Sequence, residues 1–146
     1  MRLTHYTDYS LRVLIYLATK NTNDLTTIQE IADAYDISKN HLMKIIYELG
    51  KVGVIETIRG RNGGIRLAQA PENINLAWLV REVEEDFHLV ECFNSEKNQC
   101  VLTPSCRLKG ILGEALAAYF QVLEKYTLND LVQHRDELSA LFFPNG

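Results

Sequence analysis

The chain lacks the features that mark exported, membrane-spanning and catalytic proteins. Its longest apolar runs cover only a few of its 146 residues, which is too short to cross a bilayer. Its first residues lack the apolar core of a signal peptide, so we expect a cytoplasmic protein with no membrane partner. Outside one hairpin there is no glycine-rich loop, and no cysteine–histidine pair has a third orienting group, so we do not expect an enzyme.

Cysteine is scarce, and its three copies are confined to one short stretch. Cys92, Cys100 and Cys106 lie within fifteen residues of one another. In a reducing compartment, thiols this close together favour a metal or cofactor site, or a thiol sensor, over disulfides. Their spacing matches no common zinc or ferredoxin pattern, but their polar neighbours argue against a buried structural role. A tetrahedral site takes four ligands, so the fourth must come from elsewhere or stay open.

Positive charge is low overall but concentrated in one region. The net charge is −4, yet residues 38–66 carry six Lys or Arg against two Glu and sum to +4. A basic stripe on an acidic body is typical of a protein that touches DNA with one face.

The N-terminal half has the pattern of a helix-turn-helix. Apolar residues at three- and four-residue spacing predict a first helix over 3–20. Thr27 and Glu30 form a capping box for a second helix, and Ser38 is the expected N-cap of a third, basic helix. Two short helices joined by a tight turn, with the second basic on its outer side, indicate a DNA-reading motif.

A glycine-rich hairpin follows the third helix. Residues 54–58 and 65–67 alternate like strands on either side of the tip 59–64, whose Asn-Gly pair is a strong hairpin signal. Such a hairpin is a wing, and its arginines suit a narrow minor groove. We therefore expect DNA contacts from Ser38, Lys39, Asn40, His41, Lys44, Arg59, Arg61, Asn62 and Gly63. A half-buried packing role is the alternative for His41.

The C-terminal half predicts a long helix that needs a partner. A shorter helix is expected over 74–83, and residues 87–103 show no periodicity. Thr103 and Pro104 then read as a helix start, which makes Cys106 the third helical residue of a helix that runs to Tyr126. Its apolar residues form a coiled-coil-like seam, at Leu108, Leu112, Ala115, Tyr119, Val122 and Tyr126. So small a chain cannot bury that helix by itself, so we expect a homodimer.

The expected fold is therefore mainly α: a winged helix-turn-helix with a two-stranded wing and a long dimerisation helix. We divide it into a DNA-binding domain over 1–70, a connecting helix and cysteine-bearing loop over 71–103, and a dimerisation helix with a C-terminal helix over 104–146.

Segments along essentially the whole chain match the motifs of one known family. They are Leu3-Thr4-x-x-Thr7-Asp8-Tyr9, Ser38-x-Asn40-His41-x-x-Lys44-Ile45-Ile46, Arg59-Gly60-x-Asn62-Gly63-Gly64-Ile65-Arg66-Leu67, the three cysteines, and Tyr126-Thr127-Leu128-x-Asp130-Leu131. On these residues the chain resembles the iron–sulfur winged-helix regulators. In Asp8 and the Asn40-His41-x-x-Lys44 stretch it is similar to the nitric-oxide-sensing members of that family.

The resemblance implies a dimeric repressor that holds a palindromic double-stranded DNA operator, senses nitric oxide and controls nitrosative-stress genes. It also implies a 4Fe–4S cluster bound by Cys92, Cys100 and Cys106, with Asp8 of the partner subunit as the fourth ligand. In the members that control cluster assembly, a histidine shortly after the third cysteine completes a 2Fe–2S site. Here Arg107, Leu108, Lys109 and Gly110 follow that cysteine instead.

Other interpretations of these residues stay open. A carboxylate at Asp8 also suits the positive end of a helix dipole, which needs no metal. His88, Glu85 and Glu91 lie near Cys92 in the sequence and are rival fourth ligands. The alternative function is a 2Fe–2S regulator, or a thiol or zinc sensor, on the same winged-helix scaffold.

Overall fold

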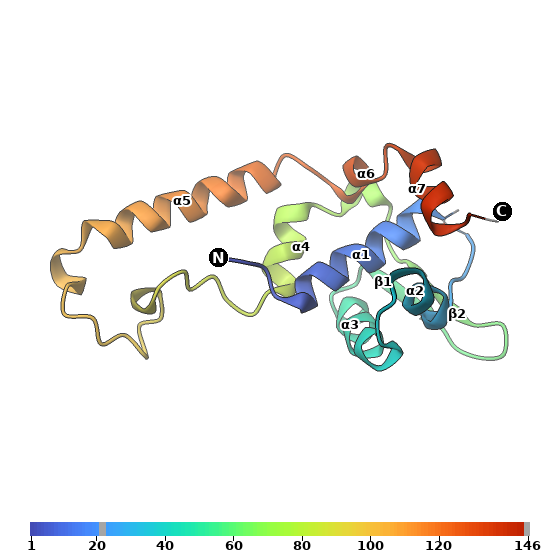
Figure 1. Ribbon diagram of the computed structural model, residues 1–146, viewed down its shortest axis with the longest axis horizontal. Helices are drawn as coiled ribbons and strands as arrows, with labels where there is room; N and C mark the ends of the chain where they lie inside the picture. Colours follow the sequence, from blue (N-terminus) through green and yellow to red (C-terminus); the bar gives the residue numbers. More distant parts are fainter. Residues whose placement is uncertain (21–22, 145–146) are drawn as a thin grey trace.

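Helix α1 (His5–Thr19) is the element around which the larger part of the molecule packs. The computed structural model describes residues 1–20 and 23–144, and in it α1 contacts elements from both halves of the chain (Figure 1). Thr4 caps the helix, because its side chain accepts a hydrogen bond from the backbone N–H of Thr7. Val13 and Leu14 are completely buried on its inner side. The first predicted helix is thus confirmed.

Two further helices form the helix-turn-helix. Helix α2 (Ile28–Tyr35) begins at the expected capping box, with both of the reciprocal hydrogen bonds present. Asp36 ends it in the left-handed conformation at a φ of 53°, which turns the chain sharply. Ser38 then caps helix α3 (Lys39–Lys51) by accepting a hydrogen bond from the backbone N–H of His41 at 3.4 Å. Both predicted caps are confirmed.

The wing is an antiparallel pair of strands that docks onto the helices. Strand β1 (Ile55–Ile58) pairs with β2 (Gly64–Leu67). Ile65 is buried in the core, and its backbone exchanges hydrogen bonds of 2.8 and 2.9 Å with Thr26, just before α2. A Cβ on Gly64 would lie 2.9 Å from the carbonyl oxygen of Thr26, so this close approach requires glycine.

The connecting helix starts later than the sequence indicated. A 3₁₀ turn, η1 (Pro71–Asn73), comes first, and helix α4 (Leu76–Val83) begins at residue 76 instead of 74. The reason is a local cap: the Asn75 side chain accepts a hydrogen bond from the backbone N–H of Trp78 at 3.1 Å.

The last two helices return to α1. Helix α6 (Leu128–Leu131) and helix α7 (Arg135–Phe142) both contact it, and Leu128 and Val132 are buried in the same core. Residues 145 and 146 of the expected C-terminal segment lie outside the described residues. We call residues 1–83 and 127–144, without the undescribed 21 and 22, the winged-helix unit.

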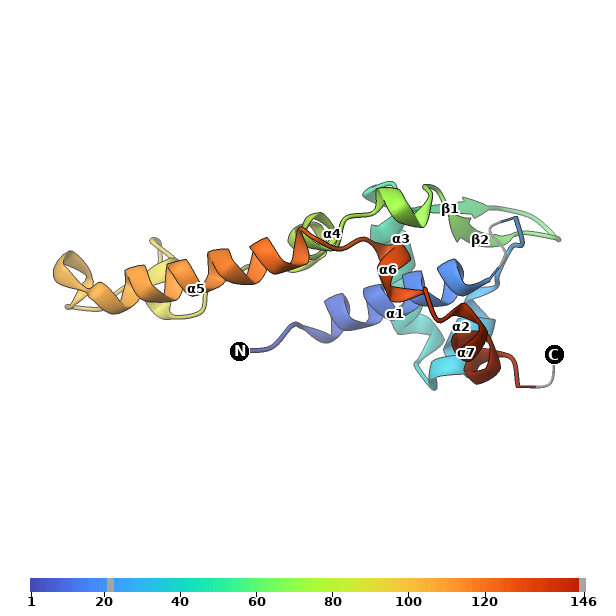
Figure 2. The ribbon, with the colours of Figure 1, turned by 90° about the horizontal axis from the view of Figure 1, so that it is seen from above.

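Residues 84–126 form an arm that projects from one end of the winged-helix unit. In two perpendicular views, helix α5 (Arg107–Leu123) extends away from the unit, and the segment before it runs alongside (Figures 1 and 2). That segment contains two short 3₁₀ turns, η2 (Glu91–Phe93) and η3 (Thr103–Ser105). We call residues 84–106 the cysteine segment.

The expected long helix is shorter at both ends, and its predicted start is wrong. Thr103 does not cap it, because residues 103–105 form the separate turn η3 and Cys106 is extended at φ −83° and ψ 113°. Cys106 is therefore the N-cap residue of α5, not the third helical residue. The helix ends at Leu123, and the backbone hydrogen bonds that follow are of the 3₁₀ type, between residues three positions apart. It is about 26 Å long at about 1.5 Å per residue.

The winged-helix fold, mainly helical with a two-stranded wing, is confirmed. The expected single seam along α5 is instead two adjacent stripes. Leu112, Leu116 and Tyr119 turn toward α4 and the cysteine segment, whereas Leu108, Ile111 and Val122 are more than half exposed. In the described ranges 1–20 and 23–144, no helix has the length and apolar content to cross a membrane.

Candidate nucleic-acid interface and metal centre

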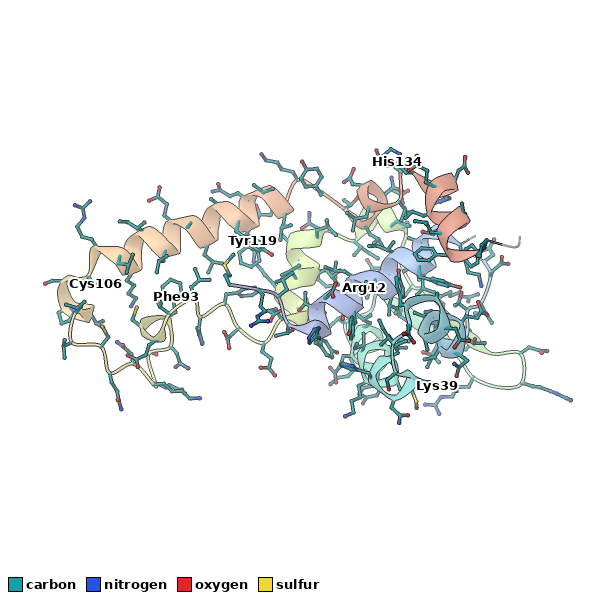
Figure 3. All side chains as sticks on the ribbon, in the orientation of Figure 1. Arg12, Lys39, Phe93, Cys106, Tyr119 and His134 are labelled. Carbon is teal, nitrogen blue, oxygen red and sulfur yellow. The ribbon has the colours of Figure 1, made fainter. Side chains whose placement is uncertain are left out.

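The start of α3 presents polar side chains to solvent. The inner face of the helix is apolar and buried, through Leu42, Ile45, Ile46 and Leu49. The outward residues are the ones expected to contact DNA, namely Ser38, Lys39, Asn40, His41 and Lys44, and all of them are exposed. Lys39 lies at the edge of the winged-helix unit, pointing away from the core (Figure 3). A recognition helix needs this geometry to reach base edges in a major groove.

His41 has a packing contact as well as an exposed edge. Its ring meets the ring of Tyr9 edge-on, with the centroids 5.2 Å apart, and Tyr9 in turn lies 5.6 Å from the ring of His5. Pairs of this geometry stabilise by about 0.5–1.5 kcal/mol beyond their buried area. The contact joins α3 to the first turns of α1, so the position of one helix constrains the other. Base contact by His41 stays a prediction.

The charged side chains at the wing tip lie on a turn whose backbone requires glycine. Arg59, Arg61 and Asn62 are exposed. Gly60 has a φ of 112°, and a Cβ on Gly63 would lie 2.1 Å from the carbonyl oxygen of Ile58. Gly63 is therefore needed to form the turn, which is a structural role independent of any contact with DNA.

The three cysteines are free thiols of one segment. Cys92 and Cys106 are half-buried, and Cys100 is exposed. Local hydrogen bonds shape the segment: Asn98 accepts from the backbone N–H of Cys100 at 3.1 Å and donates to Thr103 at 2.8 Å. Cys106 is the N-cap residue of α5, and its side chain makes no capping hydrogen bond there.

This donor set fits an iron–sulfur cluster in chemistry, since thiolates are the ligands that such clusters take. Among the described residues, no three His, Cys, Asp or Glu side chains are grouped to hold a metal ion, so the structure does not bring Cys92, Cys100 and Cys106 together as a ligand set. Cys106 lies at the far tip of the arm, whereas Arg12, the neighbour of Asp8, lies in the winged-helix unit (Figure 3).

Asp8 has a partner within its own helix. Its carboxylate accepts from Arg12 at 3.2 Å (Nε) and 2.9 Å (Nη2), a bidentate pair four residues apart. The guanidinium of Arg12 also lies 5.4 Å from the ring centre of Tyr9 and 5.9 Å from that of Tyr35. The side chain of Asp8 is 43% exposed, so the carboxylate remains reachable from outside. Binding a metal would require Asp8 to exchange Arg12 for that metal.

The rival fourth ligands lie along the cysteine segment. His88 pairs with Asp86, whose carboxylate accepts from the His88 backbone N–H at 2.9 Å. Glu91 accepts from the backbone N–H of Gln99 at 3.2 Å. Glu85 and His88 line a cavity of about 680 Å³ between the start of the chain and α5.

A carboxylate that the sequence did not single out connects the arm to α1. Glu84, the C-cap residue of α4, accepts hydrogen bonds from the backbone N–H and the hydroxyl of Thr4 and from the hydroxyl of Thr7. Burial, together with the nearby charge of Glu84, raises the pKa of Tyr119 on α5. Glu84 and Thr4 are 80 positions apart, so no local pattern joins them.

Comparison with known proteins gives consistent matches over nearly the whole chain. Residues 3–134 match the family model Rrf2, described as an iron-dependent transcriptional regulator. A relative from Bacillus licheniformis, named HTH-type transcriptional regulator NsrR, is 63% identical over 97% of this chain and 99% of its own length. A regulator of the same name from Bacillus subtilis is 57% identical, with 97% of each chain covered.

Solved structures agree with the fold. CymR of B. subtilis, titled the global cysteine regulator, superposes with a TM-score of 0.74 at 27% identity, over 92% of this chain and 98% of its own. A structure titled T. potens IscR superposes with a TM-score of 0.72 at 22% identity, over 94% and 90% of the two chains, and supports the fold alone.

Proposed function

Because the chain belongs to the Rrf2 family of iron-dependent transcriptional regulators, we propose that it is a dimeric repressor that senses nitric oxide through a 4Fe–4S cluster. The family membership makes it a DNA-binding transcriptional regulator. The observation that carries the finer proposal is the set of three free thiols on one projecting segment, in a chain whose relatives at 50–63% identity are named NsrR. A cytoplasmic location suits reduced thiols of this kind.

DNA binding uses the exposed start of α3 and the tip of the wing. The recognition helix lies in the major groove, where Asn40 is suited to adenine and Lys39 and Lys44 to guanine or phosphate. Arg59 and Arg61 reach the neighbouring minor groove. Two copies related by a twofold axis would hold the two halves of a palindromic operator, at a spacing that the dimer fixes.

The dimer is supported by the outer stripe of α5. Leu108, Ile111 and Val122 are 58, 55 and 52% exposed on one side of a helix whose other side already packs inward. Apolar residues at this spacing suit packing against a second helix of the same kind. In such a dimer, we propose that each chain offers its Asp8 to the cysteines of the other.

Cys92, Cys100 and Cys106 would hold the cluster, with Asp8 of the partner subunit completing the four ligands. Such a cluster would supply iron with which nitric oxide reacts, and a carboxylate is a harder and weaker ligand for that iron than thiolate. Asp8 would tie one winged-helix unit to the cysteine segment of the other chain when it holds the cluster, and it pairs with Arg12 when it does not. Loss of that tie would change the spacing of the two units and so weaken operator binding.

The test is to load the protein with iron and sulfide anaerobically and to measure its affinity for a duplex selected from a random-sequence library by the loaded protein. We expect nitric oxide to lower that affinity at least tenfold. Equal affinity with and without nitric oxide contradicts the sensor proposal. The ratio of iron to sulfide to protein separates a 4Fe–4S from a 2Fe–2S cluster, and zinc in place of iron favours the alternative sensor.

Four variants identify the fourth ligand. Asp8→Ala should fold and still bind iron, but with an altered absorption and circular dichroism spectrum and faster cluster loss. Glu85→Ala, His88→Ala and Glu91→Ala are the matched controls, because each removes one rival donor. An unchanged spectrum for Asp8→Ala together with a changed one for a control would transfer the role to that residue.

A further inference from the structure

The carboxylate of Glu84 forms a clamp on the start of α1. It accepts from the backbone N–H of Thr4 at 3.2–3.3 Å, from the Thr4 hydroxyl at 3.2 Å and from the hydroxyl of Thr7. Thr7 is completely buried, and Glu84 is half-buried. Three donors from the first turn of one helix therefore converge on a single carboxylate that follows another helix.

The physical chemistry of the clamp favours a firm joint. The first turn of a helix has unpaired N–H groups and a partial positive charge, and both are satisfied by a carboxylate. Hydrogen bonds to a charged acceptor are roughly twice as strong as those between neutral groups. The bonds from Thr4 are exposed, whereas the one from Thr7 is partly buried, which limits competition from water. Glu84 therefore adds hydrogen bonds from three donors to the single hydrogen bond of the Thr4 cap.

The clamp lies between the two functional parts of the chain. On one side, Glu84 is the first residue of the cysteine segment. On the other side, α1 places Asp8 and Tyr9 directly after Thr7, and the ring of Tyr9 meets the ring of His41 on α3 at 5.2 Å. One carboxylate therefore joins the beginning of the cysteine segment to the helix that carries the candidate fourth ligand and contacts the recognition helix.

We propose that Glu84 is a positioning residue, which sets the start of α1 so that Asp8 is presented to the partner subunit and α3 is aligned for DNA. The proposal rests on the proposed function, and assigns Glu84 no contact with the cluster or with DNA. Because each chain would carry its own cysteine segment and offer its own Asp8 to its partner, the clamp also links the two cluster sites of the dimer. Loss of the cluster at one site should then weaken the hold on the Asp8 that the same chain offers to the other site.

The first test compares operator affinity in the cluster-loaded and cluster-free states, with the duplex selected by the unaltered protein. Glu84→Gln removes the charge and keeps the size, and Glu82→Gln on the exposed side of α4 is the matched control. We expect the loaded-to-free affinity ratio to fall at least fivefold in Glu84→Gln and to stay unchanged in Glu82→Gln, since allosteric couplings commonly span 5–150-fold. A variant that loses stability but keeps the wild-type ratio overturns the proposal.

The second test uses the other side of the clamp. Thr7→Ser keeps the hydroxyl and should retain the wild-type ratio, whereas Thr7→Val keeps the shape, removes the donor and should match Glu84→Gln. If both Thr7 variants behave alike, the clamp does not carry the coupling.

Hydrogen exchange separates this proposal from the proposed function. In the cluster-free protein, Glu84→Gln should speed amide exchange in the first two turns of α1, and Glu82→Gln should not. If the unaltered protein binds DNA equally well with and without its cluster, the proposed function fails and exchange alone decides the role of Glu84. Unchanged exchange at the start of α1 in Glu84→Gln would then remove it as a positioning residue.

Discussion

The winged-helix unit and the arm are built by opposite packing rules. The unit draws buried apolar side chains from α1, α2, α3, both strands, α4 and α6 into one core. In the arm, Phe120 is the one buried residue among the seventeen of α5, all of which the structure describes. The small cluster around it, with Ala77 and Val80 of α4, joins the arm to the unit at one end only.

This contrast shows which part of the chain is complete as it stands. The winged-helix unit has a continuous apolar core and presents the exposed polar start of α3 on its surface. The arm leaves an apolar stripe and three thiols exposed to different degrees. A second copy of the chain could cover the stripe and complete the ligand set of the thiols. Under the proposed function, the chemical change would begin in the arm and reach the unit at the end where the two parts join.

The largest expected effect distinguishes the buried core of the winged-helix unit from the exposed stripe of the arm. Leu14→Ala in the unit should lower the free energy of unfolding by about 2–5 kcal/mol, because it opens a cavity at a completely buried site. Leu108→Ala on the arm, at a side chain that is 58% exposed, should change it by less than about 0.5 kcal/mol. Urea unfolding of dilute protein measures both. Similar losses would show that the arm has a core of its own and would break the comparison.

The next effect concerns association. Ile111→Glu places a charge on the outer stripe of α5 and should raise the dimer dissociation constant at least tenfold, which is about 1.4 kcal/mol. Ala117→Glu, on another exposed side of the same helix, is the matched control and should not. Sedimentation velocity over a concentration series measures the constant. Equal weakening by both substitutions would mean that another side of α5 forms the interface.

Helix starts provide a smaller contrast. Ser38→Ala removes the cap of α3 and should cost about 1 kcal/mol of stability. Cys106 occupies the same position in α5 but makes no capping hydrogen bond with its side chain. In cluster-free protein, Cys106→Ser should therefore slow amide exchange in the first turn of α5. The free energy of local opening there should rise by a few tenths to about 1 kcal/mol. Faster exchange in that variant would mean that the thiol contributes more to the helix start than a hydroxyl does.

The smallest effect concerns a buried hydroxyl of the unit. Within the described part of the chain, the hydroxyl of Tyr6 is buried without a hydrogen-bond partner. Tyr6→Phe should therefore change the free energy of unfolding at pH 8 by less than about 0.5 kcal/mol.

The same substitution should matter more at high pH. Burial, followed by the charge of Glu48, raises the pKa of Tyr6 from 10.0 to about 12. A raised pKa gives stability that is complete below pH 10 and is lost as the pH rises through 12. Tyr6→Phe should thus lessen the loss of stability between pH 8 and pH 11 in parallel denaturation curves. An identical alkaline loss in both proteins would assign it to other tyrosines.

The sequence predicted those elements whose local signals, caps and turns, coincide with the pattern of buried apolar residues. The capping box before α2, the Ser38 cap and the glycine-rich wing are short-range patterns, and each was predicted at its observed place. The start of α5 was missed because Thr103-Pro104 satisfies the same rule as a helix cap while forming a 3₁₀ turn. The split stripe on α5 follows from packing against α4 and Phe87, which no periodicity in α5 reveals.

The candidate site could be predicted only in its parts. Clustered cysteines and exposed recognition residues are visible in the sequence, but contacts over long separations are not. Arg12 beside Asp8 fits an ordinary helical pair, and the clamp between Glu84 and the start of α1 spans 80 positions. The fourth ligand depends on a second chain, so it stays a prediction.

The crowded glycines of the wing set a rule for re-engineering the target preference of this protein. Gly63 and Gly64 have no room for a Cβ, at 2.1 and 2.9 Å from neighbouring carbonyl oxygens. A mutant library that randomises the whole tip would therefore consist mostly of misfolded wings. One that keeps both glycines and varies Arg59, Arg61 and Asn62 would explore side chains on an unchanged backbone, so that differences among its members would test the proposed groove contacts.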